Sequence, residues 1–482
     1  MRTFEIAVII VILAVTAGIL WMKQTRRLNT VMLAVLLAAV ALHGGIEHFR
    51  IQMAPAYAAA LGLLMLLGFR LLKPDRRSRS RKPKLLWKSL LLIAVLLLSG
   101  ISVYACRLLP MFSLPEPTGH YAIGTVVREL TDESRDETKN PGAKRKLMIN
   151  VWYPADPAQT AGKPKEHYPS ALGEAVSLVF GLPKQLFSHV TGIPTHVTAD
   201  VQLSAEETSY PVLLFSPGIR STRFQSMTVI EELVSHGYIV VGIDHPYTSA
   251  KVTYSDGNSA YYVPDPKFDT SAELYNHNVN GIAIRAADAS FVMDTLEGWN
   301  VKDPGGLLQG RLDLSRAGIF GHSYGGATTA EALAQDPRFK AGVSLEGAFW
   351  GKVAKTGLTQ PFMYIMSGDI VQKLAQTGPQ TDPLIFEEFI PDLKSVMARS
   401  TADTYFLTVD RYIHQSFTDI ALLSPSLFAG GLDPVHAVDI SRSYVRAFFD
   451  QYLKDEPQAL LTGPAAEFPE VKFDPAYTHK RQ

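Results

Sequence analysis

The chain has 482 residues, of which 47% are hydrophobic, which is enough for two or three domains rather than one. Its formal net charge is zero, but residues 1–110 carry 15 Lys and Arg against 3 acidic residues, whereas the remainder carries 31 against 43. The basic residues lie between apolar segments, which argues against nucleic-acid binding, and the single cysteine, Cys106, excludes an intramolecular disulfide and a cysteine-based zinc cluster.

Four long apolar segments lie within the first 110 residues, at 5–22, 29–46, 53–72 and 89–109. Each is close to the length of about 20 residues that crosses a bilayer as a helix. A cleaved signal peptide is the competing interpretation of the first segment. Its apolar core is long, however, no small-residue cleavage pattern follows it, and three basic residues close it: Lys23, Arg26 and Arg27. We therefore expect residues 1–110 to form a transmembrane region of four helices.

Basic residues in the connecting loops predict how these helices are oriented. Eight Lys or Arg lie between Lys73 and Lys88, and the loop before the second helix carries three more. Such loops are retained in the cytoplasm. We therefore expect an integral membrane protein, in a plasma or inner membrane, with residues 111–482 on the extracytoplasmic side. The predicted helices contain almost no ionisable groups that would be buried, which disfavours a pump or channel.

From about residue 111 onward, short predicted strands alternate with helices. The strands lie at 147–155, 210–218, 238–246, 316–321, 340–347, 361–369 and 405–409, the helices at 227–237, 284–299, 325–336 and 440–454, and a hairpin at 252–263. Several strands, such as YPVLLFSPG, are continuously apolar, as buried parallel strands are. This alternation predicts an α/β domain over residues 111–482, with a mostly parallel sheet and helices on both faces.

The motif GHSYGG, at residues 321–326, stands between a predicted buried strand and a predicted helix. A Gly-x-Ser-x-Gly match alone is weak, but this context is the one in which a serine nucleophile is held on a tight bend. The small residues Gly321 and Gly325 allow the chain to turn sharply, and the turn lifts the Ser323 hydroxyl above the end of the strand. Amide groups at the start of the following helix then face the same point.

Several ordered segments resemble the secreted platelet-activating-factor acetylhydrolases, which are serine lipases with the α/β-hydrolase fold. They are LPEPTGHYAIGT (114–125), LLFSPGIRSTRF (213–224), ELVSHGYIVVGIDHP (232–246), GHSYGGATTAEALAQDPRFKAGVSLEG (321–347) and HQSFTDI (414–420). The resemblance covers about residues 113–455 and leaves the four apolar segments outside. It implies an α/β-hydrolase fold and a carboxylic ester hydrolase.

The resemblance also implies roles for individual residues. Ser323 matches the nucleophile and His414 the general base, while the backbone N–H groups of Ile219 and Tyr324 match the oxyanion hole. Glu346 stands where the family usually has an aspartate, 23 residues after the serine, and is a departure from its pattern. The chain order of serine, acid and histidine is that of α/β-hydrolases.

A second acid remains an alternative. Asp369 ends the predicted strand 361–369, where many α/β-hydrolases carry their acid. The resemblance favours Glu346, and a carboxylate in either position would fix the tautomer of the imidazole.

The sequence thus predicts a membrane-anchored serine esterase that cleaves short-acyl esters, with phospholipid esters among the candidate substrates. Its partners would be the ester or lipid substrate and, through the N-terminal helices, membrane lipids. Soluble small esters or polyesters are alternative substrates, and a catalytically inactive hydrolase-like scaffold is the non-enzymatic alternative. Neither a metal nor an organic cofactor is implied, and the sequence gives no indication of the oligomeric state.

Overall fold

The computed structural model describes residues 1–72, 85–375 and 383–480. The chain divides into two compact units, one comprising Met1–Phe112 with Gln185–His189 and the other Ser113–Lys184 with Val190–Gln482. Each unit has a hydrophobic core of its own. Most of the basic loop on which the predicted orientation rests, residues 73–84, lies outside the described residues.

The first unit contains four apolar helices in its described part: α1 (Thr3–Trp21), α2 (Arg26–Ile46), α3 (Ala54–Leu72) and α4 (Leu85–Leu108), with the 3₁₀ turn η1 (Ile51–Met53) before α3. They agree with the predicted segments to within a few residues. All four are long and apolar enough to cross a membrane. Side chains such as Ile12, Leu36 and Leu63 pack in a shared core, whereas Ile10 and Leu97 are about 60% exposed. Such exposure of large apolar side chains is expected of a lipid-facing surface.

The expectation that these helices bury almost no ionisable group was wrong. Glu5 is fully buried in the first turn of α1, where it forms ion pairs with Arg50 at 2.6 Å and Arg2 at 2.9 Å. His43 is also buried and lies 3.2 Å from Glu47. These groups lie near the ends of their helices. The partner of Glu5, Arg50, lies 45 residues away in the chain, so the separate segments do not reveal this pair.

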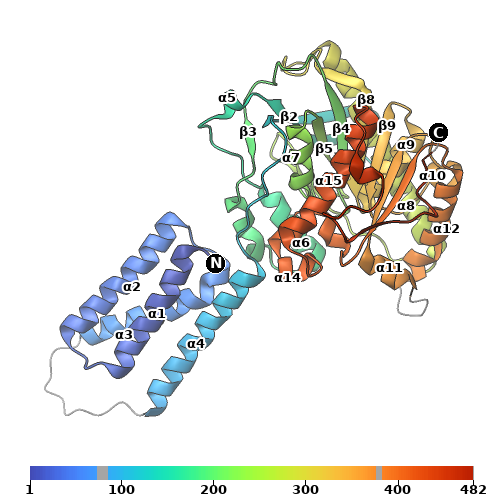
Figure 1. The fold of residues 1–482 in the computed structure, drawn as a ribbon. Coiled ribbons are helices and arrows are strands. Elements are labelled where there is room, and N and C mark those ends of the chain that lie inside the picture. The colour runs from blue at the N-terminus through green and yellow to red at the C-terminus, as the bar shows by residue number, and fades with distance from the viewer. Residues whose placement is uncertain (73–84, 376–382, 481–482) are drawn as a thin grey trace. The chain divides into compact units, whose positions relative to one another are not determined.

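The second unit is built on a sheet of ten strands among the described residues, in the order β12-β11-β10-β9-β8-β4-β5-β2-β1-β3. Its strands β2, β5, β4, β8 and β9 are labelled in Figure 1. The strands are β1 (Ala122–Asp136), β2 (Lys144–Ala155), β3 (Val197–Ala199), β4 (Tyr210–Ser216), β5 (Ile239–Asp244), β8 (Leu312–His322), β9 (Phe339–Leu345), β10 (Phe362–Ser367), β11 (Thr404–Val409) and β12 (Val471–Phe473). From β5 to β11 all neighbouring strands are parallel, and β2 and β12 flank this central part in antiparallel register. The predicted, mostly parallel sheet is confirmed.

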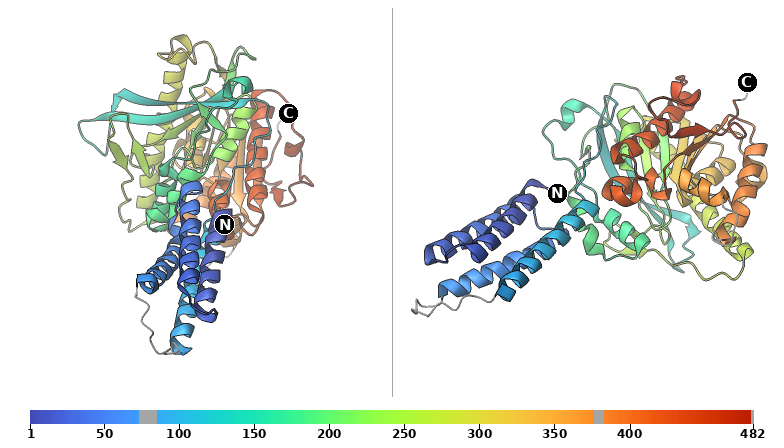
Figure 2. Two further views of the ribbon diagram at one scale, coloured as in Figure 1. Left: turned by 90° about the vertical axis from the view of Figure 1, so that its left-hand side faces the viewer. Right: turned by 60° about the horizontal axis from the view of Figure 1, so that its bottom comes forward.

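Helices cover both faces of this sheet (Figures 1 and 2). One face packs against α7 (Met227–Ser235) and α15 (Pro434–Leu453), and the other against α8 (Ser271–Val301), α9 (Tyr324–Gln335), α10 (Lys352–Thr356) and α12 (Pro383–Arg399). The remaining elements are α5 (Pro157–Thr160), α6 (Ser170–Phe180), α11 (Gly368–Ala375), α13 (Ile420–Leu423), α14 (Pro425–Phe428), the 3₁₀ turns η2 (Lys184–Gly192), η3 (His414–Phe417) and η4 (Ala459–Leu461), and the hairpin β6 (Lys251–Thr253) with β7 (Ser259–Tyr261).

Successive side chains of β4 point to opposite faces of the sheet and pack against the helices on each face. Val212 and Leu214 belong to the core that includes side chains of α8 and α9. Phe215 points to the other face, where it packs against Phe320 at 4.9 Å between ring centroids, and Phe320 in turn contacts Phe449 of α15. Because every residue of β4 is buried, its sequence is a continuous apolar run rather than an alternating one.

Several helices of the unit were not predicted, α12 among them, and two further parts differ from the sequence prediction. Helix α8 begins at Ser271 instead of 284, because the Thr270 hydroxyl caps it by accepting from the Glu273 amide at 3.2 Å, although the first turns lack an apolar period. The strands β1, β3 and β12 were not predicted. β1 carries many charged residues on its outer part, and the other two have only three residues each.

The carboxyl ends of the parallel strands meet at one edge of the sheet. Ser323 follows β8, Glu346 follows β9, Asp369 follows β10 and His414 follows β11. In open α/β sheets this edge is where ligands bind. The fold therefore brings the sequence-predicted residues to the edge where a reaction site is expected.

Candidate active site

Ser323 occupies a strained bend between β8 and α9. Its backbone has φ 56° and ψ −122°, a conformation that L residues rarely adopt. The Ser323 amide donates to the Leu345 carbonyl at 2.8 Å, and the Ser323 carbonyl accepts from the Ala327 amide at 3.1 Å. These bonds hold the residue between strand and helix, with its side chain half-buried. This is the strand–turn–helix geometry expected of a nucleophile elbow.

Both glycines of the motif are required by close backbone contacts. A Cβ atom on Gly321 would overlap the carbonyl oxygen of Gly325, and one on Gly325 would overlap the carbonyl oxygen of Ser216 at the end of β4. The bend therefore packs directly against the neighbouring strand, and no larger residue fits at either position.

Glu346 is hydrogen-bonded to His414. Its Oε2 atom lies 2.6 Å from His414 Nδ1, while Oε1 accepts from the Ser367 amide at 2.8 Å and from the Ser367 hydroxyl at 2.5 Å. The carboxylate is almost fully buried, and both oxygens are used. Ser367, at the end of β10, was not singled out from the sequence, because nothing local signals that a serine there supports an acid on the next strand.

Asp369 faces a different partner. It lies in the first turn of α11, and its carboxylate pairs with Lys373 at 2.7 Å, while its amide donates to the Tyr412 carbonyl at 3.1 Å. Among the described residues it makes no hydrogen bond to His414. The structure thus brings Glu346, and not Asp369, to the imidazole.

His414 begins the turn η3 and is 35% exposed, so a substrate can reach its ring. Its ring centroid lies 4.6 Å from that of His322, the residue just before Ser323. Within the described part of the chain, Nδ1 bonds to Glu346, and no protein group bonds to Nε2. The Ser323 hydroxyl makes no hydrogen bond to this ring, and such bonds often form only once substrate is bound.

His322 is a buried connector rather than a reacting group. Its Nε2 lies 2.9 Å from the His414 carbonyl oxygen and its Nδ1 lies 3.1 Å from Gln225 Nε2. Burial, with the neighbouring His414, holds the pKa of His322 well below its usual range. The neutral ring therefore donates through Nε2 and accepts at Nδ1. Gln225, which also accepts from the Gly218 amide at 3.0 Å, was not predicted from the sequence.

The two candidate oxyanion donors are free amides. Ile219 lies in the loop after β4, and a Cβ atom on the preceding Gly218 would lie 3.5 Å from the Ser323 Cβ, which places this loop against the nucleophile elbow. Tyr324 begins α9, where the first amides have no partner inside the helix. Among the described residues, neither the Ile219 nor the Tyr324 N–H donates to a protein acceptor. Both are therefore available to an anion.

A second Ser–His–Asp arrangement lies beneath the same strand ends. Ser216 Oγ is 3.0 Å from His245 Nε2, and His245 Nδ1 is 2.8 Å from Asp288 Oδ2. All three side chains are at most 1% exposed, which excludes a substrate. Asp288 also pairs with Arg145 at 2.6 Å and with Arg135 at 2.9 Å. This cluster joins β4, β5 and α8 and has no access to solvent.

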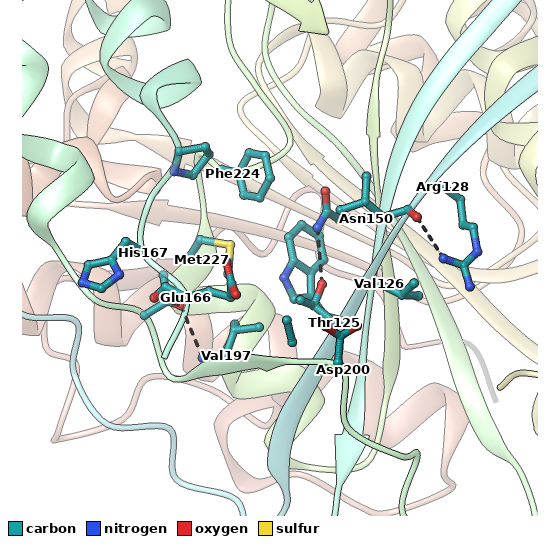
Figure 3. A pocket seen from close by; sticks show the side chains of 15 residues that line it. Thr125, Val126, Arg128, Asn150, Glu166, His167, Val197, Asp200, Phe224 and Met227 are labelled. Atoms are coloured by element: carbon teal, nitrogen blue, oxygen red, sulfur yellow. Dashed lines mark hydrogen bonds between the residues drawn. The ribbon is translucent and has the colours of Figure 1, made fainter. Parts of the chain in front are cut away.

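A cavity of about 420 Å³ lies elsewhere on the unit, over β1, β2 and β3 (Figure 3). Its lining includes Thr125, Asn150, Trp152, Phe224 and Met227. Ser323, Glu346 and His414 do not line it. The described residues also contain no group of three or more His, Cys, Asp or Glu side chains suited to a metal ion. The chemistry of the side chains, rather than the size of a cavity, thus identifies the candidate site.

Comparison with known proteins defines the class. The ferulic acid esterase from Streptomyces cinnamoneus superposes with a TM-score of 0.59 at 25% identity, covering 76% of this chain and 99% of that protein. The protein is an ester hydrolase with the α/β-hydrolase fold. The model of the family "platelet-activating factor acetylhydrolase, isoform II" matches residues 109–280 and 303–459. The chain belongs to that family.

Individual relatives are distant but align over most of their length. A probable 1-alkyl-2-acetylglycerophosphocholine esterase of Arthroderma benhamiae is 25% identical over 395 residues, covering 75% of this chain and 94% of the relative. The platelet-activating factor acetylhydrolase of Gallus gallus is 23% identical, and the alignment covers 71% of this chain and 84% of the relative. A cutinase of Thermobifida alba, est1, is 25% identical over a shorter part, 40% of this chain and 53% of the cutinase.

Proposed function

We propose that the protein is a membrane-anchored serine esterase that cleaves short acyl groups from esters through an acyl-Ser323 intermediate. The observation that carries the proposal is the 2.6 Å contact between Glu346 and His414. Nε2 of His414 has no partner among the described residues, and the His414 carbonyl accepts from His322, the neighbour of the strained Ser323. In this assignment Ser323 is the nucleophile, His414 the general base and Glu346 the acid that orients the imidazole. Asp369, paired with Lys373, has no role in the reaction.

The chemistry follows from these positions. As Ser323 Oγ attacks the ester carbonyl carbon, its proton passes to His414 Nε2, and Glu346 stabilises the imidazolium through Nδ1. The carbonyl oxygen becomes an oxyanion, which accepts from the Ile219 and Tyr324 amides. Collapse expels the alcohol, which takes its proton from His414. Water then repeats the sequence on the acyl-serine, so that the carboxylic acid leaves and Ser323 regains its proton.

An apolar acyl chain suits the surroundings of the nucleophile. Tyr324 packs with Ile282 and Ala327, and the partly buried side chains of Ile219 and Trp350 lie against this cluster. The Tyr324 and Trp350 ring centroids are 5.7 Å apart. Aromatic and aliphatic groups of this kind favour an apolar chain over a charged one. The names of the relatives from Arthroderma and Gallus favour acetyl esters of phospholipids, whereas the cutinase and the ferulic acid esterase keep small esters and polyesters as alternative substrates.

We further propose that the four apolar helices anchor the catalytic domain on the extracytoplasmic side of a membrane. Support comes from their length and composition and from the basic loops between them. Because the native Cys106 is buried, orientation is best tested with introduced cysteines in a Cys106→Ala background. A membrane-impermeant thiol reagent should label Ser315→Cys in intact cells and Ser78→Cys only after permeabilisation. The reverse pattern would contradict the orientation.

Substrate and mechanism are tested together with the full-length protein in detergent or liposomes. Wild type, Ser323→Ala and the control Ser315→Ala, an exposed position on the strand that precedes Ser323, are assayed on acyl esters of increasing chain length. We expect acetyl and propionyl esters to be hydrolysed fastest, phospholipid esters among them, and only Ser323→Ala to be inactive. A wild-type protein that hydrolyses no ester and fails to react with a fluorophosphonate would instead support an inactive scaffold.

A further inference from the structure

Arg285 of α8 is a fully buried cation that the proposed mechanism does not use. Among the described residues it forms no ion pair. The nearest acid along its helix, Asp288, is occupied by Arg145, Arg135 and His245. Burial lowers the pKa of Arg285 to about 10, so it remains protonated at neutral pH. A buried charge without a carboxylate partner is costly, which suggests that its position serves another purpose.

The donors of Arg285 hold the loop that carries Ile219. Nη1 donates to the Pro217 carbonyl at 2.7 Å and Nε to the Thr248 hydroxyl at 3.0 Å. Thr248 in turn accepts, through its carbonyl, from the Arg220 amide at 2.8 Å. Pro217, which precedes the Gly218–Ile219 pair, is therefore held directly by Arg285. Arg220, which follows the pair, is held through Thr248. The remaining nitrogen, Nη2, has no hydrogen-bond partner among the described residues.

The same guanidinium also contacts the second candidate donor. The Cζ atom of Arg285 lies 5.0 Å from the centre of the Tyr324 ring, within the range of a cation–π interaction. Tyr324 stays neutral, because burial raises its pKa to about 12. One side chain thus touches the Tyr324 residue and the loop of Ile219, which come from two different strand ends.

We propose that Arg285 is a positioning residue for the oxyanion hole, which fixes the Pro217–Ile219 loop relative to Tyr324 so that both amides face the same oxygen. Its positive charge, which no ion pair neutralises among the described residues, adds to the field that favours an anion there. This inference rests on the proposed function, since it presupposes an acyl-transfer reaction at Ser323. It assigns no contact between Arg285 and the substrate.

The test compares Arg285→Lys and Arg285→Gln with wild type on p-nitrophenyl acetate, with active sites counted by fluorophosphonate titration. Lysine keeps the charge but loses the planar fork, and glutamine loses both. We expect kcat per titrated site to fall roughly 10- to 100-fold for Gln and less for Lys, somewhat below the effect of deleting an oxyanion donor. KM should change little. Affinity for a boronic acid that mimics the tetrahedral intermediate should fall in parallel with kcat.

Arg145→Gln provides the matched control. Arg145 is an equally buried arginine bound to Asp288 and Glu137, but it contacts neither Pro217 nor Tyr324. We expect this variant to lower the melting temperature without changing the ratio of boronic-acid affinity to KM. If the Arg285 variants behave in the same way, with kcat and boronic-acid affinity intact, Arg285 is purely structural and the inference is wrong.

Two further variants keep the outcome interpretable. Should Arg285→Gln fail to fold, Thr248→Val removes the acceptor of Nε, together with the hydrogen bond that the Thr248 hydroxyl donates to the His245 carbonyl at 3.2 Å. It should still lower kcat and boronic-acid affinity together, by a smaller factor. An unchanged Thr248→Val would then overturn the inference. Failure of the proposed function appears separately, as hydrolysis retained by Ser323→Ala.

Discussion

The molecule contains two Ser–His–acid arrangements at neighbouring strand ends, and their difference shows what makes such a group reactive. In one, Glu346 and His414 meet beside Ser323, His414 is 35% exposed, and the serine is held at positive φ. In the other, Ser216, His245 and Asp288 form both hydrogen bonds in full but are buried completely. The residue types are similar, and each histidine bonds to its acid through Nδ1, at 2.6 Å in the first and 2.8 Å in the second. Among the described residues, only the second has a hydrogen bond between serine and imidazole. Access for substrate and free amides beside the hydroxyl belong to the first alone.

The largest difference in activity should appear when each of the two serines is replaced by alanine separately. Ser323→Ala is expected to lose roughly 10⁴-fold or more in kcat, because the nucleophile is absent. Ser216→Ala should retain most activity and lose about 1 kcal/mol of unfolding free energy, since only one buried hydrogen bond is removed. Steady-state kinetics and thermal denaturation of both proteins check this. Equal losses of activity would remove the distinction between the two groups.

The acids offer the next comparison. Glu346→Gln should lower kcat by about 10²–10⁴-fold, because an amide no longer stabilises the imidazolium and favours the wrong tautomer. Asp369→Asn, which disturbs only the pair with Lys373, should stay close to wild type. The same ester assay, corrected for the number of titrated sites, measures both. A severe loss in Asp369→Asn with an active Glu346→Gln would reverse the assignment.

His245, the histidine of the buried arrangement, should affect how the free energy of unfolding depends on pH. Burial and the nearby Arg285 lower the pKa of His245 to about 4, although the hydrogen bond that His245 donates to Asp288 acts in the opposite direction. The unfolded state, with an ordinary pKa near 6.5, then binds more protons than the folded state between pH 6.5 and 4. This group therefore makes its full contribution above pH 6.5, and up to about 3 kcal/mol is lost as the pH falls through 4.

Denaturant unfolding of wild type and His245→Gln between pH 7 and 4 isolates that contribution. Other groups titrate in both proteins, so the difference between their slopes reports His245. We expect a shallower decline of unfolding free energy in the variant, even though it is less stable at pH 7. Parallel curves would show that His245 is not held neutral by the fold.

The sequence predicts the parts of the site that local patterns determine. The buried strands and the GHSYGG bend have local signals, and the resemblance locates His414 and Glu346. It does not predict Ser367, Gln225 or Arg285, because their contacts join residues far apart in the chain and each residue type is ordinary in its own segment. The same limit explains the buried Glu5–Arg50 pair, which becomes visible only once the helices are packed.

Whether Ser323 carries the acyl group during turnover is tested most directly by acid-quenching the enzyme with excess acetyl ester and mapping the acetylated peptide by mass spectrometry. We expect one acetyl group on the peptide that contains Ser323, and none in Ser323→Ala. Acetylation of Ser216, or turnover that continues in Ser323→Ala, would contradict it.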